Sequence, residues 1–256
     1  MSEHRPRGIY ILPNLFTIAS LFSGFLGMVW AIQGQFELAA VAILVSCVCD
    51  GLDGHVARMT KASSEFGVQM DSLADLVAFG VGPGLLIYLW QTHAFGRLGL
   101  VSSFLFIACG ALRLARFNVQ AMRGGNGGSK KFFTGLPIPA AACVLATLVL
   151  FSGYLPEDVL QSVIPTFSLA LIYLLALLMV SKVRYASFKD VELIKAHPYT
   201  ASVAVVLIFV LVASEPKLIG FLFFMAYLIS GLAYSFVAVP LRRGTFLRGL
   251  SRQKPS

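Results

Sequence analysis

Apolar residues run along this chain in long stretches that short polar breaks separate. A helix needs about 20 mostly apolar residues to cross a bilayer whose hydrocarbon core is roughly 30 Å thick. Eight stretches are predicted to form membrane-spanning helices: 9–33, 36–57, 67–90, 98–119, 136–154, 160–181, 199–214 and 217–239. Any one of them could be a buried helix of a soluble protein. Eight in succession predict an all-α, polytopic integral membrane bundle.

Composition agrees with a membrane protein, and the charge distribution predicts its orientation. Only 12% of the residues are charged, against about 25% in an ordinary soluble domain. If the N-terminus is cytoplasmic, all but two of the 20 basic residues fall on the cytoplasmic side, the exceptions being Arg97 and Lys217. This asymmetry predicts that both termini are cytoplasmic. The net charge of +8 then belongs to a solvated face beside lipid headgroups, and nucleic-acid binding is not indicated.

Four aspartates interrupt the apolar pattern where the second predicted span ends and the third begins. A carboxylate at a helix centre in lipid costs about 3 kcal/mol, so four facing lipid would cost on the order of 10 kcal/mol. Asp50 and Asp53 are three residues apart, and Asp71 and Asp75 are four apart, so each pair shares a helix face. A short hairpin around 61–64 is predicted to bring the two pairs together at the cytoplasmic interface. In the third span, the Pro and Gly residues of 80–84 predict a kink.

Carboxylates that converge in this way repel one another unless cations neutralise them. A set of oxygen ligands without His or Cys is typical of Mg²⁺, Mn²⁺ or Ca²⁺. Gly54 and Gly67 would let a ligand approach the backbone closely. Arg58 can form hydrogen bonds to a phosphate oxygen, and the Ser64 hydroxyl can donate another. An ion pathway and a metal-dependent enzyme that binds a diphosphate both remain open. The glycines and the arginine favour the enzyme.

The pattern D-x-x-D-G-x-x-A-R-x8-G-x3-D-x3-D resembles the signature of the CDP-alcohol phosphotransferases. Every signature position is met, by Asp50, Asp53, Gly54, Ala57, Arg58, Gly67, Asp71 and Asp75. The resemblance implies a six-helix membrane core, here followed by two more spans, and a homodimer. It implies transfer of a phosphatidyl or similar group from a CDP-linked lipid to an alcohol, with release of CMP. It also implies that all four aspartates together hold two metal ions and that Asp75 deprotonates the acceptor. Gly54, Arg58 and Ser64 would contact the CDP-lipid.

Further segments resemble the bacterial and archaeal phosphatidylserine synthase branch of that family: 12–17, 69–80, 113–118 and 133–142. The resemblance implies that the acceptor is the hydroxyl of L-serine and that the products are phosphatidylserine and CMP. Glycerol 3-phosphate and inositol phosphate remain alternative acceptors for the same chemistry. We expect a multi-pass protein of the cell (inner) membrane with a cytoplasmic active site. Residues 1–183 would form the transferase domain, and 184–256 a cytoplasmic loop, two more spans and a basic tail.

The acceptor site is predicted on the fourth span and the loop after it. Arg113 and Arg116 lie three apart on one helix face and can bind a carboxylate bidentately, with Asn118 and Lys131 completing the pocket. The same cations would also suit a phosphate, and their side chains could instead snorkel to the interface.

A nucleotide contact is predicted on the first span. Asn14 and Thr17 lie on one helix face there and can contact the nucleotide. Their alternative role is a hydrogen bond to a neighbouring helix.

Overall fold

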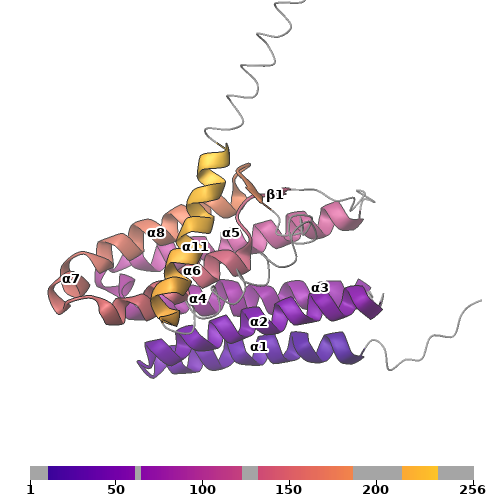
Figure 1. The fold of residues 1–256 in the computed structure, drawn as a ribbon, viewed down its shortest axis with the longest axis horizontal. Coiled ribbons are helices and arrows are strands. Elements are labelled where there is room, and N and C mark those ends of the chain that lie inside the picture. Colours follow the sequence, from indigo (N-terminus) through magenta and orange to yellow (C-terminus); the bar gives the residue numbers. More distant parts are fainter. Residues whose placement is uncertain (1–10, 61–64, 123–131, 187–214, 236–256) are drawn as a thin grey trace, which may run out of the picture.

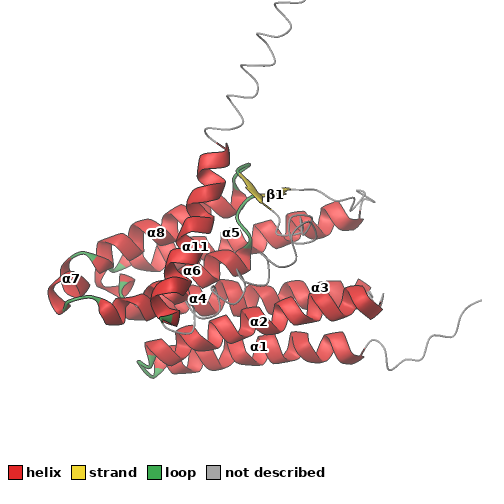
Figure 2. Ribbon diagram, in the orientation of Figure 1, coloured by secondary structure: helices red, strands yellow, loops and turns green. Residues whose placement is uncertain are grey.

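Helices make up nearly all of the structure (Figure 2), a computed structural model that describes residues 11–60, 65–122, 132–186 and 215–235. The predicted all-α class is confirmed for these residues, with one exception. Strands β1 (Phe132–Thr134) and β2 (Arg184–Ala186) form an antiparallel ribbon in which Phe133 pairs with Tyr185. Three-residue strands are too short for an alternating pattern to reveal them in the sequence.

Helices α1 (Ile11–Ile32) and α2 (Phe36–Thr60) form a closely packed antiparallel pair along one side of the bundle (Figure 1). Hydroxyl groups join them, because Ser20 Oγ and Ser46 Oγ lie 2.8 Å apart and Ser46 also donates to the Ser20 carbonyl. Gly24 brings α1 against the third predicted span, where a Cβ at this position would lie only 2.7 Å from Ala78 Cα. Small residues and hydroxyls are the usual means of packing helices in a membrane.

The third predicted span consists of three consecutive pieces: α3 (Glu65–Asp75), a π-helical turn η2 (Leu76–Val81) and α4 (Gly82–Trp90). The Gly82 N–H donates to the Val77 carbonyl five residues earlier, which is the π pattern. Pro83 has no N–H for a regular helical bond, and the wider turn accommodates its ring. The irregularity therefore begins before the predicted kink, directly after Asp75.

The other helices enclose α6 (Ile138–Phe151), whose residues from Ala141 to Leu150 are all buried. The long helix α5 (Arg97–Met122) packs against α8 (Ile164–Val180), and the short helix α7 (Glu157–Ser162) precedes α8. Short 3-10 turns follow α4 (η3, Thr92–Phe95) and α6 (η4, Ser152–Tyr154).

Helix α11 (Pro216–Ala233) crosses the bundle steeply in Figure 1 and packs against α6. Its start is tied to the end of the bundle where α2 begins. Lys217 Nζ lies 2.8 Å from a carboxylate oxygen of Glu37, and the Tyr154 hydroxyl donates to Glu215. The Phe151 and Phe221 rings stack with centroids 4.7 Å apart.

Four of the described helical segments are long and apolar enough to cross a membrane: Leu15–Ile32, Phe66–Trp90, Arg97–Gln120 and Pro216–Ala233. Two shorter apolar segments, Ile138–Tyr154 and Ile164–Val180, accompany them. The 25-residue helix α2 carries three carboxylates and is not among the four. The predicted span 199–214 and the hairpin 61–64 lie outside the described residues, so eight spans and a six-helix core stay predictions.

Candidate active site

Three of the four signature aspartates come together where α2 approaches its end and α3 begins. Asp50, Asp53 and Asp71 each offer a carboxylate oxygen, and these oxygens all lie within 4.8 Å of one another. Asp53 is buried, with 8% of its surface exposed, and Asp50 and Asp71 are half-buried. The sequence spacing correctly predicted the shared faces, and the antiparallel course of α2 and α3 brings those faces together.

Asp75 joins the cluster through Asp50. The two carboxyl groups lie within hydrogen-bonding reach of each other. Asp75 is the last residue of α3, one turn beyond Asp71, and the π-helical turn η2 follows it at once. Such turns often occur at functional sites.

Thr17 on α1 orients one ligand of the cluster. Its hydroxyl donates to Asp53 Oδ2 at 2.6 Å, and both side chains are buried. A hydrogen bond to a carboxylate is among the stronger ones in proteins and holds the acceptor group in one orientation. Thr17 therefore forms a hydrogen bond from α1 to a predicted metal ligand on α2. This is the bond to a neighbouring helix that the sequence analysis gave as its alternative role.

The cluster suits a divalent cation. Its ligands are all oxygen atoms, which Mg²⁺, Mn²⁺ and Ca²⁺ prefer. Two opposite ligands of one Ca²⁺ lie about 4.6–5.2 Å apart, and those of Mg²⁺ about 4.0–4.2 Å apart. The oxygens of the three aspartates lie within 4.8 Å of one another, which is close enough for one divalent cation to bind all three. Half-buried carboxylates this close together repel strongly when no cation is bound.

Arg113 is a buried cation on α5, a helix that also contacts α3. Only 8% of its surface is exposed, and its guanidinium lies 4.5 Å from the centre of the Phe117 ring. It interacts electrostatically with Asp75 and with Tyr227 of α11. Its Nε is buried and makes no hydrogen bond within the described part of the chain. Arg113 therefore does not snorkel to the interface, whereas Arg116 is exposed.

Asn118, also on α5, forms hydrogen bonds to the neighbouring helix α3. Its side-chain amide donates to Ser72 Oγ at 3.0 Å and to Gln69 Oε1 at 3.3 Å, both on α3. These bonds hold α3, which carries Asp71 and Asp75, against α5, which carries Arg113.

The remaining predicted site residues are placed only in part. Gly54 and Arg58 belong to α2, Gly67 to α3, and Asn14 to α1. The side chains of Arg58 and Asn14 lie outside the described residues, as do Ser64 and Lys131 entirely. Tyr227, which interacts electrostatically with Arg113, was not predicted from the sequence. No local pattern distinguishes it from the other aromatic residues of its helix.

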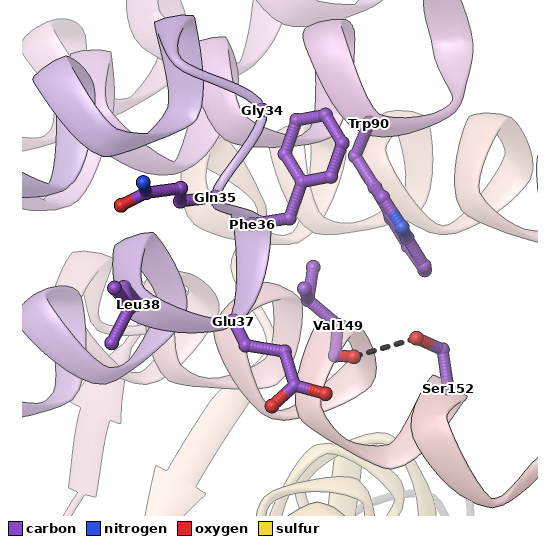
Figure 3. A pocket seen from close by; sticks show the side chains of 8 residues that line it. All are labelled: Gly34, Gln35, Phe36, Glu37, Leu38, Trp90, Val149 and Ser152. Atoms are coloured by element: carbon purple, nitrogen blue, oxygen red, sulfur yellow. Dashed lines mark hydrogen bonds between the residues drawn. The ribbon is translucent and has the colours of Figure 1, made fainter.

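Away from the aspartates, a hollow of about 390 Å³ is shown in Figure 3. It is lined by the turn between α1 and α2, the first residues of α2, and Trp90, Val149 and Ser152. It lies about 20 Å along α2 from Asp50, given 1.5 Å per residue from Glu37. Two of its polar groups are already engaged, because Glu37 pairs with Lys217 and Ser152 Oγ donates to the Val149 carbonyl at 2.6 Å. The aspartate cluster, with three converging carboxylates, is therefore the candidate site.

Comparison with known proteins finds a matching family and several similar proteins. Residues 10–181 match the family described as CDP-alcohol phosphatidyltransferase. The chain is 42% identical over 184 residues to a CDP-diacylglycerol–serine O-phosphatidyltransferase of Helicobacter pylori, covering 72% of this chain and 75% of the relative. It is 34% identical over 185 residues to the protein of that name from Methanocaldococcus jannaschii, covering 72% and 78%. An archaetidylserine synthase of Methanothermobacter thermautotrophicus is 36% identical over 156 residues, covering 60% and 64%.

Proposed function

The chain belongs to the CDP-alcohol phosphatidyltransferase family, a family of transferases, and we propose that it transfers the phosphatidyl group of CDP-diacylglycerol to the hydroxyl of L-serine. The products are phosphatidylserine and CMP. The observation that carries the proposal is the carboxylate cluster of Asp50, Asp53 and Asp71, with Asp75 beside it. The names of the relatives from Helicobacter pylori and Methanocaldococcus jannaschii support serine as the acceptor.

Asp50, Asp53, Asp71 and Asp75 are assigned to hold divalent cations, Mg²⁺ or Mn²⁺, two in number, with Ca²⁺ as a bound substitute. When bound, such cations neutralise the diphosphate and the charge that develops on the leaving CMP. The carboxylate oxygens of Asp50, Asp53 and Asp71, which all lie within 4.8 Å of one another, support this assignment. Thr17 keeps Asp53 in the orientation that ligation requires.

Asp75 is assigned as the base. It takes the proton from the serine hydroxyl, and the serine oxygen forms a bond to the lipid-side phosphorus. The bond from that phosphorus to the bridging diphosphate oxygen breaks, and CMP leaves. Its place at the edge of the cluster, next to Asp50 and in electrostatic contact with Arg113, supports this role.

The CDP-lipid would lie against α1 and α2. Gly54, Arg58, Ser64, Gly67, Asn14 and Thr17 are proposed to contact its polar part. An entirely apolar groove of about 380 Å³ lies between α1 and η2, lined by Ile18, Leu21, Phe22 and Phe25 of α1 and by Val77 of η2. Ile18 follows Thr17, and Val77 follows Asp75 by two residues. We assign this groove to an acyl chain, because its lining is entirely apolar and comes from α1 and η2, the elements next to the aspartate cluster.

The setting of the reaction follows from the charge pattern. The protein is proposed to lie in the cell (inner) membrane with its termini and active site cytoplasmic, as the distribution of basic residues supports. Residues 1–183 would form the transferase domain and 184–256 an additional segment. A homodimer is the assembly that the family suggests.

One experiment tests the function and its alternatives. Purified protein in lipid nanodiscs receives CDP-diacylglycerol, Mg²⁺ and one acceptor, either L-serine, glycerol 3-phosphate, inositol phosphate or choline, and CMP release is measured. We expect release with serine that EDTA abolishes and Mg²⁺ or Mn²⁺ restores. Preference for another acceptor would refute the serine assignment and leave the family chemistry intact. Metal-dependent cation flux in liposomes without CMP release would favour a cation pathway.

A further inference from the structure

The segment beyond the family match, which ends at residue 181, adds two tyrosines to the surroundings of Arg113. Tyr185 lies on β2 and is fully buried, and Tyr227 lies on α11. Their ring centroids are 5.5 Å apart. Tyr227 interacts electrostatically with both Tyr185 and Arg113, and Arg113 with Asp75. These four side chains therefore form an electrostatically coupled series from the proposed base to α11.

Two members of this series have buried polar atoms without a partner. The Tyr185 hydroxyl and Arg113 Nε make no hydrogen bond among the described residues. Buried polar groups in proteins are nearly always hydrogen-bonded, since leaving one unsatisfied destabilises the fold. Two such groups in one series, one cationic and one a hydroxyl, indicate a ligand that supplies the missing bonds. An anionic group fits Arg113, and a hydrogen-bonding group fits the tyrosine.

Packing holds Tyr185 in this place. A Cβ at Gly231 on α11 would overlap the Tyr185 ring, so only glycine allows the ring to lie against that helix. β2 is itself fixed by its pairing with β1, in which Tyr185 lies opposite Phe133. The fold thus accommodates an unsatisfied hydroxyl at a fully buried position, where a phenylalanine would pack equally well and avoid the loss of stability.

We propose that Tyr185 and Tyr227 form, with Arg113, the closed wall of the acceptor compartment, so that α11 selects a small zwitterionic hydroxy acid. Arg113 binds the carboxylate of the acceptor. The Tyr185 hydroxyl accepts a hydrogen bond from its ammonium group, and the Tyr227 ring offers an aromatic face to the same cation. A sugar phosphate has no ammonium group to donate to the Tyr185 hydroxyl. This inference rests on the proposed function and assigns its specificity to residues outside the matched core.

Two variants test the wall, each with a matched control. Tyr185→Phe removes only the hydroxyl, and Tyr173→Phe makes the same change at a half-buried tyrosine whose hydroxyl donates to the Leu98 carbonyl. Gly231→Ala displaces the Tyr185 ring, and Gly220→Ala adds the same methyl to the same helix in ordinary contact with Thr147. KM and kcat are measured for serine and for CDP-diacylglycerol in nanodiscs, together with Tm in the absence of substrates.

We expect Tyr185→Phe to raise the KM for serine about 5- to 30-fold, the factor that corresponds to one lost hydrogen bond of about 1–2 kcal/mol. The KM for CDP-diacylglycerol should stay unchanged, and Tm should stay level or rise because an unsatisfied hydroxyl is gone. Gly231→Ala should raise the KM for serine further, and both controls should match the wild type.

An unchanged KM for serine in Tyr185→Phe would overturn the inference. A fall in Tm with equal changes in both KM values would also overturn it, because that is the signature of a purely structural tyrosine. If the wild type released CMP only with another acceptor, the proposed function would fail on its own, before any variant is compared. Tyr185→Phe introduces no new atoms, so the test stands even if Gly231→Ala does not fold.

Discussion

Replacing Thr17 with valine separates the two roles that the sequence allowed for this residue. Valine has nearly the same shape but cannot donate the 2.6 Å hydrogen bond to Asp53 Oδ2. Hydrogen bonds to charged groups contribute about 1.5–3 kcal/mol, which corresponds to about 10- to 150-fold in an equilibrium constant. The two side chains are 6% and 8% exposed, so water cannot easily replace the lost donor.

The loss should appear as weaker metal binding. Without the Thr17 hydroxyl, the buried Asp53 carboxylate is no longer held in one orientation, and a cation must order it on binding. We therefore expect the Mg²⁺ concentration for half-maximal CMP release to rise about 10- to 100-fold, the usual effect of removing a group that orients a metal ligand. At saturating Mg²⁺ most of the kcat should return.

Thr147→Val is the matched control. Its hydroxyl is also buried but donates to the Cys143 carbonyl of its own helix at 2.6 Å, so the Mg²⁺ requirement should not change. The reasoning is refuted if Thr17→Val leaves the Mg²⁺ requirement as it was. A rise confined to the KM for CDP-diacylglycerol would instead assign Thr17 to the nucleotide.

Three further changes have defined outcomes. Asp75→Asn should lower kcat for CMP release about 10²- to 10⁴-fold even at saturating metal, the range for loss of a general base, and near-normal turnover would exclude Asp75 as the base. Arg113→Met removes a buried charge of similar length and should raise the KM for serine at least tenfold more than that for CDP-diacylglycerol; equal effects on both would indicate a packing role. Gly24→Val should lower stability by about 1–3 kcal/mol, because its Cβ meets Ala78 Cα at 2.7 Å, whereas Gly51→Ala, with nothing within 4 Å of the added methyl, should leave Tm within a degree or two of the wild type.

The spacing of the aspartates allowed most of the candidate site to be predicted without a structure. Residues three and four apart share a helix face whatever surrounds them, and the cost of carboxylates in lipid requires those faces to meet. The prediction that Asp50, Asp53 and Asp71 converge is confirmed. The helix bounds also agree closely, since α1, α5 and α11 begin within two residues of the predicted spans.

Interactions between distant segments could not be predicted from the sequence. Thr17 and Asp53 are 36 residues apart, and Tyr185 meets Gly231 across a still longer separation. Nothing in the local pattern of either partner specifies the other. The choice between the two roles of Thr17, and between snorkelling and burial for Arg113, depended on which surface each helix face meets.

The sequence by itself determined that this chain is a helical membrane protein with a carboxylate site of a recognisable family, because apolar length and residue spacing are local properties. Tertiary structure decided the rest. It placed the π-helical turn directly after Asp75 and the Thr17 hydroxyl on Asp53, and it brought α11 towards Arg113. These features arise only when helices pack, since packing alone determines which polar groups are paired and which are left for a substrate.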